Sequence, residues 1–324
     1  MSRVQTIRGS IASEELGRTL SHEHLTTGSP GMERIPDLLD RAEMIDRCLE
    51  ALRRAHEVGI DSLIDLTPFD LGRQVWLFEA VAEQSPINIV CATGVYRWVP
   101  VVYWGWDEDR IAEHFVREIE DGIEGSTIRA GAIKLAWDLE YRLDEIAGRT
   151  SPREILERTA RAAARASKST GVPISCHTRA QDELGIPLLD IFEDEGLDLR
   201  AVTIGHSNDS QDFDYLRGLA ARGTTVGLDR FFAAEPEYVA ERSNVALELV
   251  KAGYAEQICL GHDGSPAGLW GGWSDERRSD CWTLVSEHEV RWLLEHGATE
   301  DDVDAMQRRS IRATFDAAAA LVGG

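Results

Sequence analysis

Short apolar runs alternate along the chain with longer stretches of helical spacing. Several of these runs are continuously apolar, which is typical of parallel strands that are covered on both faces. The predicted strands span residues 19–25, 62–67, 87–94, 130–136, 172–178, 202–206, 224–229 and 258–263. This rhythm predicts an α/β protein built from repeated units in which a strand is followed by a helix.

The stretches between these strands carry the signals of helix ends. Ser151 precedes a proline at the first helical position, which is typical of a helix start. Gly59, Gly171 and Gly253 each end a helical stretch just before the next strand. The clearest predicted helices span residues 37–58, 107–122, 152–170, 212–222 and 235–252.

The chain has the length of an α/β barrel, and no linker rich in proline, glycine or serine divides its 324 residues. A doubly wound open sheet is the main alternative fold. Neither GxGxxG nor GxxxxGKS/T follows a predicted strand, so the usual nucleotide-binding reason for that alternative is missing. We therefore expect one domain over residues 1–324, a single (β/α)8 TIM barrel with a short N-terminal extension.

The composition limits the classes of partner. The formal net charge of −23 disfavours binding to nucleic acid and to anionic membranes. No stretch approaches the ~20 apolar residues of a membrane span, and the N-terminus lacks the apolar run of a signal peptide. The five cysteines form no CxxC pair, so we expect a reduced, cytoplasmic protein that acts on a small molecule.

Histidines and an aspartate lie at the ends of several predicted strands. His22 and His24 are two residues apart, so both side chains face the barrel interior. His177, His206 and Asp263 close three other strands, at the edge where barrel active sites lie. A lone histidine on an apolar strand is more often a hydrogen-bonded core residue. The convergence of all five on one edge predicts a metal site.

Lys134 lies inside the apolar strand 130–136, where an unpaired ammonium is costly. Burial favours the neutral amine, which can add carbon dioxide and become a carbamate whose oxygens bridge two metals. The alternatives are a lysine that reaches to the rim or one that pairs with a carboxylate such as Asp138. Beside the histidines, we favour the carbamate.

Together these residues resemble the phosphotriesterase family of the amidohydrolase superfamily. The similarity extends over almost the whole chain, and the set of six positions is far more specific than any one motif. Local phrases also match, at residues 8–9, 17–20, 21–25, 130–131 and 204–207.

The resemblance implies two divalent metals held by six side chains. These are His22, His24, Lys134, His177, His206 and Asp263. The first two histidines and Asp263 would hold the more buried metal, and the other two histidines the more exposed one. N6-carboxylysine at Lys134 would bridge the metals together with a hydroxide, and Asp263 would accept the proton of this nucleophile. We expect zinc, although the same ligand types accept manganese, cobalt or iron.

Two further positions resemble the lactonase-like branch of the family. By that resemblance, Tyr96 would lie beside the hydroxide as a catalytic and substrate-binding residue, and Arg230 would lie at the substrate mouth. The alternatives are a tyrosine that packs on the rim and an arginine that pairs with Asp229 or a neighbour. Two aromatic loops, with Trp98 and Trp270, would wall an apolar pocket, or else pack against a helix or a partner subunit. We expect a homodimer.

Three functions remain open at this point. The first is hydrolysis of a lactone or related carboxylic ester, with promiscuous phosphotriesterase activity. The second is hydrolysis of an amide or N-acyl amino acid, with Arg230 gripping a carboxylate. The third is a barrel that binds a hydrophobic ligand without turnover. His262 alternates away from Asp263, so we expect it to pack behind the barrel.

Overall fold

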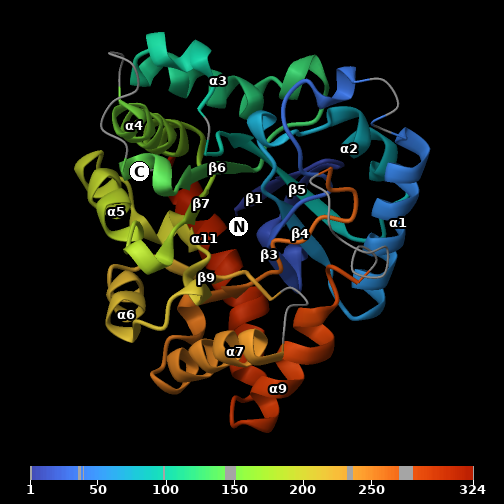
Figure 1. The fold of residues 1–324 in the computed structure, drawn as a ribbon, viewed down its shortest axis with the longest axis vertical. Helices are drawn as coiled ribbons and strands as arrows, with labels where there is room; N and C mark the ends of the chain where they lie inside the picture. Colours follow the sequence, from blue (N-terminus) through green and yellow to red (C-terminus); the bar gives the residue numbers. More distant parts are fainter. Residues whose placement is uncertain are drawn as a thin grey trace.

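Eight parallel strands form the centre of the molecule, and helices surround them (Figure 1). The computed structural model describes residues 2–35, 38, 40–97, 99–142, 151–231, 236–269 and 280–323. The strands follow one another in chain order, as β3 (Thr19–Glu23), β4 (Ser62–Asp65), β5 (Asn88–Gly94), β6 (Ala132–Trp137), β7 (Ile174–Thr178), β8 (Val202–Gly205), β9 (Thr225–Leu228) and β10 (Ile258–Leu260). A parallel bridge between Glu23 and Gly264 joins the last strand region to the first. The predicted (β/α)8 barrel is confirmed.

The five helices predicted from the sequence are present, most of them with narrower ends. The helices are α1 (Arg41–Glu57), α2 (Val75–Ala82), α3 (Glu108–Glu120), α4 (Pro152–Thr170), α5 (Gly185–Asp194), α6 (Phe213–Ala221), α7 (Pro236–Lys251), α9 (Val290–Glu295), α10 (Glu300–Asp304) and α11 (Ser310–Ala320). Ser151 and Glu154 form a capping box at the start of α4, as the Ser-Pro signal predicted. None of the described helices has the length and apolarity that crossing a membrane requires.

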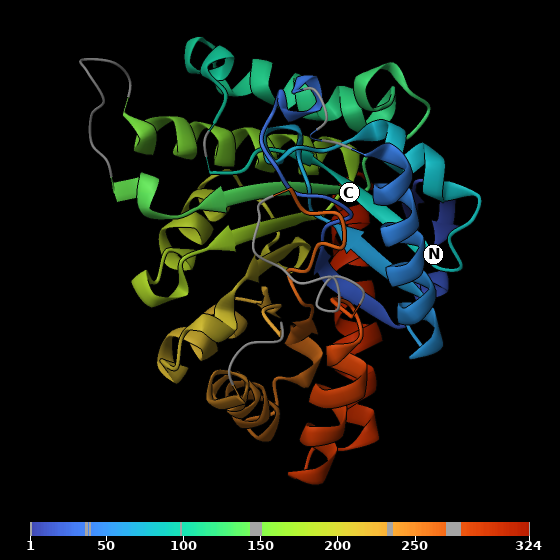
Figure 2. The same ribbon diagram turned by 45° about the vertical axis from the view of Figure 1, so that its right-hand side comes forward.

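The N-terminal extension is itself a small sheet, which the sequence pattern did not reveal. Strands β1 (Arg3–Thr6) and β2 (Gly9–Ala12) form an antiparallel hairpin, and the backbone N–H of Ile7 donates to Ile89 on β5. The N-terminus lies on the right in Figure 2. There Ser2 Oγ donates to Asp316 of α11.

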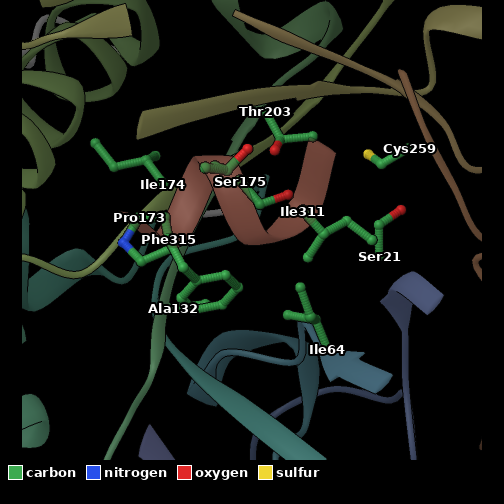
Figure 3. Close-up of a pocket in the computed structure, with 11 residues that line it drawn as sticks. Ser21, Ile64, Ala132, Pro173, Ile174, Ser175, Thr203, Cys259, Ile311 and Phe315 are labelled. Atoms are coloured by element: carbon green, nitrogen blue, oxygen red, sulfur yellow. The ribbon is translucent and has the colours of Figure 1, made fainter. Parts of the chain in front are cut away.

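Helix α11 covers the N-terminal end of the barrel. Its Ile311 and Phe315 are buried against residues of the barrel interior, among them Ile64 and Ala132. A cavity of about 20 Å³ remains beside these side chains (Figure 3). This end of the barrel is therefore filled by side chains. The side chains capable of binding a metal or taking part in catalysis lie at the opposite end, where the strands terminate.

Candidate metal centre

The structure brings all six predicted ligand side chains together at the C-terminal ends of the strands. They are His22 on β3, His24 directly after it, Lys134 on β6, His177 on β7, His206 directly after β8 and Asp263 after β10. All are buried except Asp263, whose side chain is 23% exposed. His206 and Asp263 have φ angles of 61° and 55°, a conformation that side chains other than glycine adopt at a cost.

Three of these residues form one group of converging ligand atoms. Oδ1 of Asp263 lies 3.1 Å from Nε2 of His24 and 3.7 Å from Nε2 of His22. All three atoms lie within 4.8 Å of one another. Nζ of Lys134 lies 2.8 Å from Nε2 of His22, at the edge of this group.

The other two histidines form a second group beside the first. Nε2 of His206 lies 2.7 Å from Nδ1 of His177. The second oxygen of Asp263, Oδ2, lies 3.9 Å from the same His206 nitrogen. Asp263 therefore turns one carboxylate oxygen toward each group.

Asp229, directly after β9, fixes two of these rings from behind. Its Oδ2 lies 2.7 Å from Nδ1 of His22, and its Oδ1 lies 2.9 Å from Nδ1 of His206. Burial alone would raise the pKa of Asp229, but His206 and His22 outweigh it and hold the pKa well below its usual range. An ionised Asp229 accepts hydrogen bonds from both Nδ1–H groups, which leaves the two Nε2 lone pairs for the centre.

From the sequence, Asp229 was considered only as a partner for Arg230. Its support of the His22 and His206 rings was therefore missed. His22, His206 and Asp229 also lie close enough together to hold an ion. However, their 2.7 and 2.9 Å contacts are direct hydrogen bonds. We therefore assign Asp229 to the support of the two rings. The available signal was its place at the end of a strand beside the predicted ligands.

Thr67 and Asp138 fix the other two rings. Oγ1 of Thr67 donates to the carbonyl of Thr26 and lies 2.9 Å from Nδ1 of His24, so this nitrogen is the donor. Oδ2 of Asp138 lies 2.8 Å from Nε2 of His177. Burial opposes the ionisation of Asp138, but the hydrogen bond from His177 outweighs it and holds the pKa below its usual range. The structure thus places Asp138 against His177 rather than against Lys134.

The tautomers of the histidines determine whether their free nitrogens can bind a metal. His177 and His206 each donate one ring N–H to a carboxylate, so the two nitrogens that face each other at 2.7 Å both carry lone pairs. Burial lowers the pKa of both histidines, which disfavours a proton between the rings. A divalent cation satisfies both lone pairs, so the donor set fits a metal.

Lys134 is fully buried and does not reach the rim. Burial lowers its pKa to about 8, against the opposing effects of Asp263 and Asp229. The neutral amine is therefore a minor fraction of the side chain at pH 7 and becomes about half of it near pH 8. This is the form that adds carbon dioxide, as the carbamate prediction requires.

Tyr96 and Arg230 both lie beside the centre. The ring of Tyr96 meets His177 edge-on at 5.4 Å, and burial raises the pKa of its phenol to about 12. Nε of Arg230 lies 3.3 Å from Oδ2 of Asp263, and its Nη1 pairs with Asp209. The alternative of an arginine paired with a carboxylate is thus present in the structure, but the partners are Asp209 and Asp263 rather than Asp229.

The aromatic loops are described only in part. Trp98 and Trp270 lie outside the described residues. Tyr103 is buried, stacks on Trp106 at 5.1 Å and hydrogen bonds His114 of α3. This part of the first aromatic loop therefore packs against a helix, which was the structural alternative.

The chain is similar to known proteins over most of its length. The sequence profile of the phosphotriesterase family matches residues 2–315. An aryldialkylphosphatase of Saccharolobus solfataricus is 30% identical, over 95% of this chain and 98% of the relative. A phospho-furanose lactonase of Mycoplasmopsis agalactiae is 26% identical over 70% and 66% of the two chains, and an N-acetyltaurine hydrolase of Xenopus tropicalis is 22% identical over 81% and 84%. The chain is therefore a hydrolase that belongs to the phosphotriesterase family.

Proposed function

We propose that this protein is a binuclear metal-dependent hydrolase of lactones or related carboxylic esters, with promiscuous phosphotriesterase activity. The observation that carries the proposal is the position of Asp263. Its two oxygens face two separate groups of histidine nitrogens, and every one of these nitrogens belongs to a ring whose other nitrogen is held by an oxygen. Such fixed rings are typical of metal ligands.

We assign His22, His24 and Asp263 to the more buried metal, and His177 and His206 to the more exposed one. N6-carboxylysine at Lys134 would bridge them. Two such ions, zinc or one of the other divalent metals that accept these ligands, would supply an activated water and polarise the substrate's carbonyl or phosphoryl oxygen.

Side chains of the protein would transfer the protons during the reaction. Asp263 would accept the proton of the nucleophile and pass it to the leaving group. Arg230, 3.3 Å from Asp263 Oδ2, keeps its charge and orients this carboxylate. Tyr96 keeps its hydroxyl hydrogen at neutral pH, because its pKa is raised to about 12, and would donate it to a substrate oxygen.

The charges around Arg230 favour an ester over an N-acyl amino acid. The amide hypothesis asks Arg230 to grip a substrate carboxylate, but its guanidinium already pairs with Asp263 and Asp209. A substrate carboxylate would have to compete with both. Hydrophobic binding without turnover explains neither the four fixed histidines nor the buried lysine.

A substrate screen tests the proposal. The metal-reconstituted enzyme is assayed with lactones of differing ring size and tail length, aryl esters, a phosphotriester and N-acyl amino acids, beside Asp263→Asn. We expect the lactones or esters to give the highest kcat/KM and the variant to lose it. Inactivity on every lactone and ester, or faster hydrolysis of N-acyl amino acids, would overturn the ester assignment.

A further inference from the structure

A second set of contacts holds the segment that carries Asp263. Glu23 lies between His22 and His24 in the sequence and is fully buried. Its Oε1 accepts hydrogen bonds from the backbone N–H of His262 at 2.8 Å and from Nδ1 of the same residue at 2.7 Å. Its Oε2 accepts from the backbone N–H of Gly264 at 3.1 Å. One carboxylate thus binds the residues on both sides of Asp263.

The hydrogen positions in this set follow from elementary chemistry. The backbone N–H of Val285 can only donate, and it lies 2.9 Å from Nε2 of His262. Nε2 is therefore the bare nitrogen, and Nδ1 carries the hydrogen that Glu23 accepts. The hydrogen bonds of Glu23 within the described chain thus come from three N–H donors, which suits a carboxylate. His262 does point away from the ligands, as predicted, but it is part of a polar network rather than simple packing.

The backbone at Asp263 needs such support. Its φ of 55° lies in the left-handed region that residues other than glycine rarely adopt. The backbone N–H of Asp263 donates to His22, and that of His24 donates to Gly264, each at 3.0 Å. These bonds attach the segment to the end of β3, and the side chain of Glu23, the last residue of that strand, adds three further hydrogen bonds to it.

We propose that Glu23 and His262 are positioning residues, which hold Asp263 so that one oxygen faces each group of histidines. The inference rests on the proposed function, because it takes Asp263 as a ligand of both metals. It extends that function to two residues that are not ligands themselves. Their removal leaves every ligand in place but frees the segment that aims one of them.

Glu23→Gln is the direct test, because it keeps the size of the side chain and replaces one acceptor oxygen by a donor. The NH2 group of the glutamine then faces an N–H group of residues 262–264, and two donors cannot form a hydrogen bond with each other. Metal-free protein is titrated with Co²⁺ and bicarbonate, and binding is followed by elemental analysis and by the visible absorption of the bound ion. We expect Co²⁺ affinity to fall by about 10–100-fold, with an altered spectrum and a lower kcat at similar KM.

Glu289→Gln is the matched control. Glu289 is also buried, at 1% exposure, and its carboxylate accepts from Ser243 rather than from residues 262–264. We expect this variant to keep the wild-type Co²⁺ affinity and spectrum. Thermal unfolding and circular dichroism of each protein separate a loss of fold from a loss of metal.

A second pair of variants decides the question if Glu23→Gln does not fold. His262→Asn keeps a side-chain donor near the position of Nδ1, whereas His262→Leu removes it. We expect the asparagine variant to retain more Co²⁺ affinity than the leucine variant. Wild-type affinity and spectrum in folded Glu23→Gln, or equal affinities in the His262 pair, would overturn the inference. Failure of the wild type to bind two ions would instead overturn the proposed function.

Discussion

At the scale of single residues, the candidate centre depends on which ring nitrogen each histidine leaves free. His22, His24 and His206 present Nε2, and His177 presents Nδ1. The difference follows from the oxygens that support the rings. Asp138 contacts Nε2 of His177, whereas Asp229 and Thr67 contact the Nδ1 atoms of the other three rings. One carboxylate, Asp229, supports a ring in each group and so links the two.

Asp229→Asn tests this link. An amide accepts with one atom and donates with the other, so it cannot accept from both His22 and His206. We expect the metal affinity to fall by about 10–100-fold. Folding stability should fall by about 1–3 kcal/mol, because a buried donor loses its partner. Metal titration and urea unfolding measure the two effects. Unchanged metal affinity would show that the rings keep their orientation without Asp229.

The ligand residues could be predicted from the sequence because their positions follow from the periodicity of each strand. Strand periodicity places His22, Lys134 and Asp263 at one edge without knowledge of their neighbours. The supporting residues could not be found this way, because a hydrogen bond between strand ends depends on register and side-chain rotation. Thr67 and Glu23 are examples, since each could equally have packed in the core.

At the scale of elements, β5 and β6 approach each other closely at Gly94. Gly94 ends β5 with a φ of 113°, and a Cβ there would lie 2.0 Å from the carbonyl oxygen of Lys134 on β6. The strands are also shorter than predicted at several ends. At the end of β4, for example, the side chain of Asp65 accepts a hydrogen bond from the backbone N–H of Thr67 in place of the ladder. Apolar periodicity does not record such local competition.

Gly94→Ala tests this close approach. We expect a loss of about 3 kcal/mol or more in the free energy of unfolding, because the methyl group meets backbone that cannot move freely. Gly253→Ala is the matched control, since its φ of 88° is also positive but nothing lies within 4 Å of its Cβ. The control should lose only about 1–2 kcal/mol. Equal losses in chemical denaturation would argue against the clash.

The packing of α7 against the segment before α9 gives a pH-dependent prediction. Burial raises the pKa of Glu289 from 4.5 to about 7, although a hydrogen bond from Ser243 opposes the shift. The folded state therefore holds this proton more tightly than the unfolded chain. Its contribution to stability is complete below about pH 4.5 and is lost as the pH rises through about 7. Glu289→Gln, which cannot ionise, should gain stability relative to wild type between pH 5 and 8. Parallel curves of unfolding free energy would contradict the shift.

At the scale of the whole molecule, one end of the barrel is packed with apolar side chains and the other holds the candidate metal centre. The N-terminal end is closed by Ile311 and Phe315 of α11, whereas the candidate centre occupies the other end. Phe315→Ala should cost about 3–5 kcal/mol of stability. It should leave the metal content of the folded protein unchanged, as measured by elemental analysis below its unfolding temperature. A parallel loss of metal would show that the two ends are coupled.

The overall architecture was predictable because the barrel repeats one local unit. The N-terminal hairpin was not, since residues 3–12 lack a long apolar alternation and depend for their order on contacts with β5 and α11. The same holds for the partners of Arg230, which depend on Asp209 and Asp263 meeting across the barrel mouth.

We propose that Lys134, the histidines and Asp263 hold two metals, and the decisive measurement is the metal content per chain. Wild type and Lys134→Ala are purified in parallel, incubated with zinc and bicarbonate, and analysed for bound metal. We expect two ions per chain in the wild type and a sharp fall in the variant. Absence of bound metal in the wild type under these conditions would contradict it, and would mean that the histidines at the strand ends serve the structure alone.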